Sequence, residues 1–167
     1  MRWESGAEGQ VPWWAMARIL LTFTVLGALA FGAAASSPEA APTCRPTTPD
    51  ALGPFYEPGA PVRSKVGSGY VLTGRVLTRS CRAIPRARIE LWLANPQGEY
   101  DDAHRATLFA GRRGGYRFES NKPPSYQSRP PHIHVRVSAR GYRTLVTQHY
   151  PRASRTSATF NLVLIKR

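Results

Sequence analysis

Short segments of alternating apolar and polar residues, separated by turn-forming residues, fill the chain from Gly69 onward. The segment 88–94 (Arg-Ile-Glu-Leu-Trp-Leu-Ala) is a clear case, and a period of two is typical of a strand with one buried face. Gly-Gly, Asn-Pro and Lys-Pro-Pro sequences favour turns between the segments. No segment shows the 3.6-residue period of an amphipathic helix. The sequence therefore predicts an all-β fold, an antiparallel β-sandwich. The expected strands are 70–77, 88–94, 115–119, 132–139, 144–150 and 159–165.

The first 35 residues have the layout of a secretory signal peptide. Met16-Ala-Arg18 begins a positive segment, 19–30 is apolar, and Ala33-Ala34-Ala35 supplies small residues at a cleavage site. Met16 is the expected initiator, because the residues before it read poorly as part of a signal. The apolar run is short for a membrane span of about 20 residues. We therefore expect an exported protein, periplasmic or extracellular, with no stable span after cleavage; an uncleaved anchor is the alternative.

After the signal, residues 36–68 are rich in Pro, Ala, Gly and Ser and predict an irregular N-terminal arm rather than a helix. Residues 69–167 then form the sandwich domain. Cys44 in the arm and Cys81 in the domain are the two cysteines. In an exported chain such a pair predicts a disulfide, here one that ties the arm to the sheet. Two unpaired buried thiols are the alternative.

The formal net charge of +13 does not by itself identify a partner. The chain has 23 Lys and Arg, of which only Lys65, Lys122 and Lys166 are lysines. The arginines are scattered along the sequence, with no block of five or more cations. We expect weak attraction to anionic surfaces or polymers and no dedicated nucleic-acid partner.

The segment 126–134 (Tyr-Gln-Ser-Arg-Pro-Pro-His-Ile-His) contains a phenol, a guanidinium and two imidazoles. In an extended strand His132 and His134 point to the same face, where they can bind one metal ion. Tyr126 and Arg129 lie on the loop before that strand. Any such site needs further ligands, and the alternative is an ordinary polar face of a strand.

A second segment, 92–100 (Trp-Leu-Ala-Asn-Pro-Gln-Gly-Glu-Tyr), presents Tyr100 after a turn. With the 126–134 segment it resembles the intradiol ring-cleavage dioxygenases, non-haem iron enzymes that open catechols between their two hydroxyls. That family has a Trp-x-Ala-Asn-x-x-Gly-x-Tyr segment followed by a Tyr and an Arg-Pro-x-His-Ile-His segment. Gly53-Pro-Phe-Tyr56 and Thr147-Gln148 match further family elements, so the resemblance covers about Cys44 to Tyr150.

The resemblance implies a ferric iron centre and names its residues. Phenolates are hard anionic donors that suit Fe(III), and imidazoles complete the set. The implied ligands are Tyr100, Tyr126, His132 and His134. A catechol-type substrate would displace Tyr126 from the metal and react with O₂ to give a muconate-type diacid.

Two further residues acquire roles from the same resemblance. Arg129 would stabilise negative charge that develops on the ring, and Gln148 would orient a ligand or a reacting oxygen. The chain lacks the helical N-terminal region of the catechol-specific branch and has short loops, which predicts an open pocket. Two alternatives are a sandwich module that binds iron or aromatic ligands without turnover, and a disulfide-stapled interaction module that uses the +13 charge. The sequence does not specify an oligomeric state.

Overall fold

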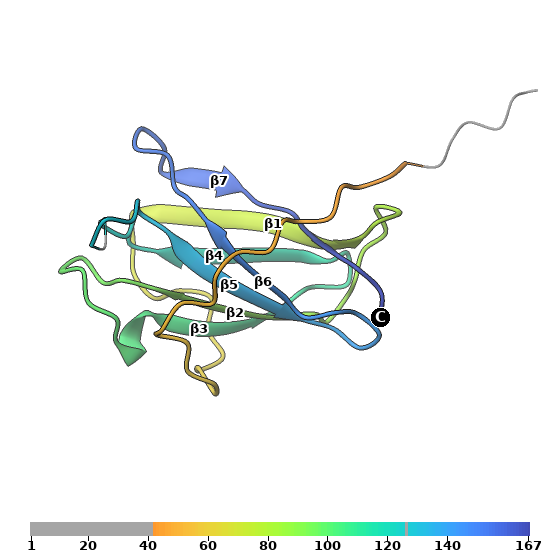
Figure 1. Cartoon of the computed structure of the whole chain (residues 1–167), viewed down its shortest axis with the longest axis horizontal. Coiled ribbons are helices and arrows are strands. Elements are labelled where there is room, and N and C mark those ends of the chain that lie inside the picture. Colours follow the sequence, from red (N-terminus) through yellow and green to blue (C-terminus); the bar gives the residue numbers. More distant parts are fainter. Residues whose placement is uncertain (1–41, 126) are drawn as a thin grey trace, which may run out of the picture. The chain divides into compact units, whose positions relative to one another are not determined.

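A computed structural model describes residues 42–125 and 127–167. Figure 1 shows these residues as two β-sheets with one short 3-10 helix, η2 (Asp102–His104). The predicted all-β fold is thereby confirmed. The strands are β1 (Tyr70–Thr78), β2 (Arg88–Leu93), β3 (Arg105–Phe109), β4 (Gly115–Ser120), β5 (Ile133–Ser138), β6 (Leu145–His149), β7 (Ser157–Thr159) and β8 (Leu162–Leu164).

One sheet has the order β4-β1-β7, with β8 also paired to β1, and the other has the order β3-β2-β5-β6. Every pairing in the second sheet is antiparallel, as is the β1–β4 pairing. The two C-terminal strands, β7 and β8, run parallel to β1. The antiparallel sandwich that the sequence predicts is therefore present. The two short C-terminal strands differ from it, because they pair with β1 in parallel.

Two differences from the predicted strands have local causes. The expected strand 159–165 is divided into β7 and β8, with Phe160 and Asn161 between them. Strand β3 was not predicted, because four of its five residues are buried and it shows no alternation. Its first residue, Arg105, is buried while its guanidinium pairs with Glu57 of the arm at 2.8 Å. Such a partner cannot be inferred from local sequence.

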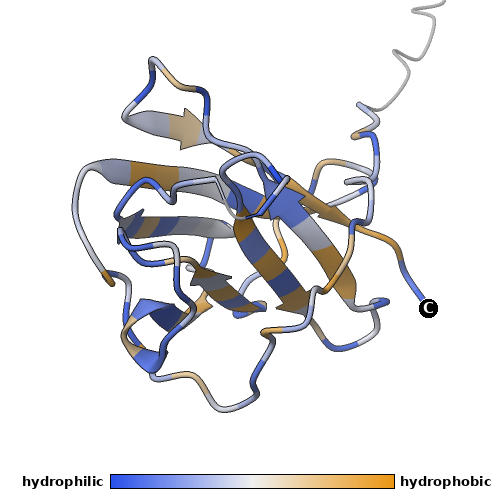
Figure 2. Cartoon of the chain, turned by 60° about the vertical axis from the view of Figure 1, so that its left-hand side comes forward, coloured by the Kyte–Doolittle hydropathy of each residue, from blue (hydrophilic) through white to orange (hydrophobic). Residues whose placement is uncertain are grey.

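The core lies between the sheets and is made by the inward faces of the strands. Leu72 and Phe118 of one sheet and Ile89 and Val135 of the other are completely buried. Figure 2 shows the corresponding alternation of hydrophobic and hydrophilic residues along the strands. Burial of each large apolar side chain stabilises the fold by about 1.5–3 kcal/mol, so this pattern determines which face of each strand points inward.

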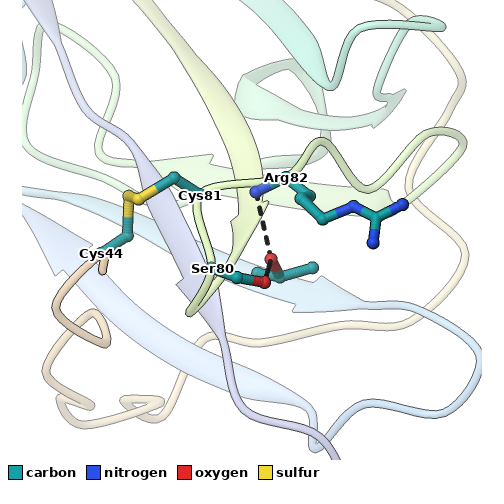
Figure 3. Close-up of a disulfide and its surroundings, with 5 residues drawn as sticks. Cys44, Ser80, Cys81 and Arg82 are labelled. Carbon is teal, nitrogen blue, oxygen red and sulfur yellow. Dashed lines mark hydrogen bonds between the residues drawn. A yellow bond between two sulfur atoms is a disulfide. The ribbon is translucent and has the colours of Figure 1, made fainter. Parts of the chain in front are cut away.

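Residues 42–68 form no named strand and hydrogen-bond to strands of both sheets (Figure 1). In the first sheet, the amide of Thr47 donates to the carbonyl of Val163 in β8 at 3.2 Å, and the amide of Val66 donates to the carbonyl of Glu119 in β4 at 2.9 Å. The backbone amide of Asp50 donates to the carbonyl of Val146 in β6 at 2.9 Å. The predicted disulfide between Cys44 and Cys81 is present (Figure 3). Beside it, the amide of Arg82 donates to Thr78 Oγ1 at 3.1 Å and stabilises the loop that bears Cys81.

Within the two described ranges, no helix is long and apolar enough to cross a membrane. The predicted signal segment 1–35, including Met16 and the apolar run 19–30, lies outside the described residues.

Candidate metal centre

The register of the second sheet places the side chains of Trp92, His134 and Gln148 in one row. Trp92 of β2 lies opposite His134 of β5, and His134 lies opposite Gln148 of β6. Directly paired residues point to the same face of an antiparallel sheet. The neighbouring residue His149 points the other way, into the sandwich, where its Nε2 lies 2.7 Å from the hydroxyl of Tyr70. The row that contains His134 therefore faces away from the core and toward the arm.

Three of the predicted ligands come together at this row. Tyr100 Oη lies 3.2 Å from His132 Nε2, and His132 Nε2 lies 3.2 Å from His134 Nε2. Tyr100 comes from the β2–β3 connection, and His132 lies just before β5 rather than within the predicted strand. The two imidazoles are buried, with 3% and 2% of their surface exposed. The fourth predicted ligand, Tyr126, lies outside the described residues.

The hydrogen bond of His132 determines which of its two ring nitrogens has a free lone pair. His132 Nδ1 lies 2.8 Å from the carbonyl of Pro130, and a carbonyl only accepts, so Nδ1 holds the proton and Nε2 the lone pair. His134 Nδ1 is buried with no hydrogen-bond partner. Burial is the main cause that lowers the pKa of His134 to about 3, and the positive charge of Arg129 acts in the same direction. At neutral pH this ring is uncharged, as a metal ligand must be.

These donors fit a trivalent or borderline transition metal. Two Nε2 atoms and a phenol oxygen face one another, and the phenolate form of a tyrosine is a hard donor suited to Fe(III). Across the described residues, no three His, Cys, Asp or Glu side chains cluster as a metal site would require. A metal centre here would accordingly depend on phenol oxygens.

The arm covers the donor atoms through a run of close contacts. Gly53 has φ +74°, and a Cβ atom built on it would lie 2.8 Å from His134 Cε1. The ring of Phe55 stacks on Tyr100 with centroids 4.3 Å apart, and Trp92 stacks on His134 at 4.8 Å and 4°. The Gly53-Pro-Phe-Tyr56 motif is recognisable in the sequence. The structure adds that Gly53 contacts His134 and that Phe55 contacts Tyr100.

Arg129 and Gln148, the two predicted residues without a ligand role, are hydrogen-bonded to each other. Arg129 Nη2 donates to Gln148 Oε1 at 2.8 Å and to Tyr150 Oη at 3.1 Å. Gln148 Nε2 donates to the carbonyl of Ala51 at 2.7 Å, so both ends of the amide have partners. The guanidinium is held close enough to influence the pKa of His134.

Sequence reasoning missed Tyr150 and Asp50, which complete this network. The Tyr150 hydroxyl donates to Asp50 Oδ2 at 2.8 Å and accepts from Arg129. Burial raises the pKa of Asp50, but the hydrogen bonds from Tyr150 and the Ala51 amide outweigh it, so the carboxyl pKa lies below its ordinary value. Burial and the Asp50 charge raise the pKa of Tyr150. The proton therefore stays on the phenol and points to the Asp50 carboxylate, which leaves a lone pair of the phenol oxygen to accept from Arg129.

Comparison with known proteins identifies the family of the chain. A family model described as "Dioxygenase" matches residues 60–158. The chain is 31% identical over 136 residues to a catechol 1,2-dioxygenase of Candida albicans, an alignment covering 59% of this chain and 45% of that protein. It is 30% identical over 131 residues to a hydroxyquinol 1,2-dioxygenase of a Rhizobium species, covering 58% and 44%.

Among solved structures, the dioxygenase domain of a dioxygenase–carbohydrate-binding protein fusion from Streptomyces sp. SirexAA-E superposes with a TM-score of 0.68 at 27% identity. That match covers 74% of this chain and all of the other. The chain spans less than half the length of the two sequence relatives named above. The matched region contains β1 to β6 and every described donor of the candidate metal centre. The chain belongs to the intradiol ring-cleavage dioxygenase family.

Proposed function

We propose that the protein is a non-haem Fe(III) intradiol dioxygenase, which cleaves a catechol-type ring between its two hydroxyls with O₂ and yields a muconate-type diacid. The main support is the position of three donor atoms. His132 Nε2 lies 3.2 Å from Tyr100 Oη and 3.2 Å from His134 Nε2. Tyr126 is the proposed fourth ligand. Ferric iron held by these residues would supply a Lewis-acidic centre that binds the catechol and activates its ring toward O₂.

The protein's own residues hold and orient the donors. His132 Nδ1 remains protonated by its bond to the Pro130 carbonyl, which directs its Nε2 lone pair to the metal position. Trp92 stacks on the ring of His134, and the backbone of Gly53 lies close to the same ring. Phe55 does the same for Tyr100 through stacking at 4.3 Å. On substrate binding, the phenolate oxygen of Tyr126 is the base on this chain that accepts a catechol proton.

Arg129 supplies preorganised positive charge. Its guanidinium is held by Gln148 Oε1 and Tyr150 Oη before any substrate is present. Donors oriented in advance toward developing negative charge contribute roughly 3–4 kcal/mol each to transition-state stabilisation. Asp50 keeps the Tyr150 hydroxyl in the orientation that lets it accept from Arg129.

Export is part of the proposal. The Cys44–Cys81 disulfide is the supporting observation, because stable disulfides persist mainly outside the cytoplasm. The short loops predict an open pocket, so the substrate screen covers several catechols.

The test uses iron-loaded full chain in two steps. A broad visible absorption band from tyrosinate to Fe(III), weakened or strongly shifted in Tyr100→Phe and shifted by added catechol, is expected first. Oxygen uptake with catechol, protocatechuate or hydroxyquinol, together with a ring-opened diacid detected by mass spectrometry, is expected second. A coloured protein that consumes no O₂ with any catechol would instead be an iron-binding module without turnover. A colourless protein that binds no iron would rule out the proposal.

A further inference from the structure

Arginines that are scattered along the sequence gather at one end of the folded domain. Four segments at this end, 79–86, 111–114, 139–144 and 165–167, contain nine Lys and Arg and no Asp or Glu. We name this region the basic end. Its cations are Arg79, Arg82, Arg86, Arg112, Arg113, Arg140, Arg143, Lys166 and Arg167.

Backbone pairing joins the four segments to one another. Figure 1 shows the β1–β2 loop, the β5–β6 turn and the C terminus together on its right-hand side. Thr78, at the end of β1, pairs with Leu164 just before the C-terminal segment. Further links are the hydrogen bonds from Arg86 N to Ala110 O (2.8 Å), Val76 N to Gly114 O (2.8 Å) and Arg143 N to Ile165 O (2.9 Å).

The candidate metal centre lies at the opposite end of the same strands. His134 is the second residue of β5, whereas segment 139–144 follows its last residue. Trp92 is near the end of β2, whereas segment 79–86 precedes its beginning. The length of the sheet therefore separates the basic end from the site that would bind a catechol.

The nine cations are exposed and lack acidic partners. Each has an exposed side chain, and none forms an ion pair with any acidic residue that the structure describes. The described acidic residues lie elsewhere, in the arm, in β2, in the β2–β3 connection and in β4. Like charges gathered in this way repel one another, so an anionic partner would relieve an unfavourable interaction.

Apolar side chains are exposed among these cations. Phe109 at the end of β3 is 54% exposed and Ile165 is 42% exposed. A hollow of ≈ 500 Å³ at the same end is lined by Tyr142, Leu164 and Ile165, with Arg79 and Lys166 also on its walls. An apolar hollow beside cations suits a ligand with both an anionic group and an apolar part.

We propose that the basic end binds an anionic phospholipid surface. The cations attract the headgroups, while Phe109 and Ile165 enter the boundary between headgroups and acyl chains. The four segments come from both sheets and spread over the end of the sandwich, which fits a plane. Duplex DNA, whose bases are stacked inside the helix, would gain little from the exposed apolar residues. Bound in this way, the domain keeps the candidate metal centre on the side away from the membrane.

The test is co-sedimentation of the full chain with phosphatidylcholine vesicles and with vesicles that also contain phosphatidylglycerol. The apolar run 19–30 is present in every variant, and neutral vesicles measure its contribution. We expect tighter binding to the anionic vesicles, and Arg112→Gln/Arg113→Gln should weaken this preference by roughly 30-fold. The matched control, Arg152→Gln/Arg155→Gln, removes two exposed cations beyond β6 and should change it little.

Two outcomes would overturn the proposal. One is equal binding to neutral and anionic vesicles at physiological salt. The other is an equal loss of preference in both double variants, which would mean that net charge alone is responsible. The Phe109→Ser variant separates a membrane from a soluble polyanion: it should weaken binding to anionic vesicles and leave the affinity for duplex DNA unchanged. If DNA binds as tightly as vesicles and Phe109→Ser affects neither, the basic end is a polyanion site and the lipid proposal is wrong.

Discussion

Gly53 and His134 approach so closely that any side chain at position 53 would collide with the imidazole. A Cβ atom at Gly53 would lie 2.8 Å from His134 Cε1, and the residue has φ +74°. Gly53→Ala should therefore displace a predicted ligand and lower iron affinity by roughly 10- to 100-fold, the range seen when groups that orient ligands are changed. Titration of the apo-protein with iron measures this.

Gly59 provides the matched control for that variant. It also has a positive φ, of +86°, but a Cβ atom there would have no neighbour within 4 Å. Gly59→Ala therefore has the backbone cost of about 1–2 kcal/mol for an L-residue at positive φ, but its Cβ atom contacts no neighbouring atom. Equal iron affinities in the two variants would show that Gly53 does not position His134.

Replacement of Tyr100 by Phe tests the phenol as a donor. The Phe side chain keeps the stacking on Phe55 but removes the oxygen that lies 3.2 Å from His132 Nε2. We expect a folded protein with weaker iron binding and loss or a large shift of the visible band. Tyr56→Phe is the control, because its hydroxyl donates to Glu90 at 3.1 Å and not to the donor atoms. A Tyr100→Phe protein with an unchanged spectrum would contradict the ligand assignment.

The Arg129–Gln148 hydrogen bond predicts a loss of turnover without a loss of metal. Arg129→Gln should lower kcat by roughly 10²–10³ because a preorganised positive charge is removed. Tyr150→Phe removes the hydroxyl that Arg129 contacts at 3.1 Å and should have a smaller effect in the same direction. Steady-state oxygen uptake, with iron content measured in parallel, checks both. Reduced iron content in Arg129→Gln would assign the residue a structural role.

Local alternation allowed the strands and the shared face of His132 and His134 to be predicted, because a period of two is a property of one strand. The neighbours of that face were not predictable in the same way. Trp92 and Gln148 flank His134 through pairings between strands far apart in the sequence. Nothing in the local pattern determines that register.

The contacts of the arm and the clustering of cations at the basic end could not be predicted from local sequence either. Gly53 looks like any turn glycine in the sequence, and its contact with His134 depends on the path of the arm across the sheet. The arginines of the basic end are scattered in sequence and gather only because the ends of four segments meet. Strand β3 was not predicted for a similar reason. Its buried residue Arg105 pairs with Glu57 of the arm, and this long-range partner is not visible in the local sequence.

The Cys44–Cys81 disulfide closes a loop with a sequence separation of 37. By chain entropy, a loop of this size is worth about 4 kcal/mol, although measured values are often smaller. Cys44→Ser/Cys81→Ser should therefore unfold at a lower denaturant concentration, as urea titration followed by fluorescence would detect. Adding a reductant to the parent protein should reproduce the shift and have no effect on the double variant. An unchanged midpoint in the double variant would mean that the bond does not stabilise the fold.

His149 predicts a stability that depends on pH. Burial lowers the pKa of its imidazole from 6.5 to about 4 in the folded protein, where Nε2 lies 2.7 Å from the Tyr70 hydroxyl. Between these pH values the unfolded chain binds more protons, so stability falls as the pH decreases from about 6.5 to about 4 and this contribution changes no further below that. His134 titrates in the same direction, so the informative quantity is the difference between parent and His149→Gln. Urea midpoints at pH 7, 5 and 4 should decline less steeply in His149→Gln, and parallel declines would show that His149 is not responsible.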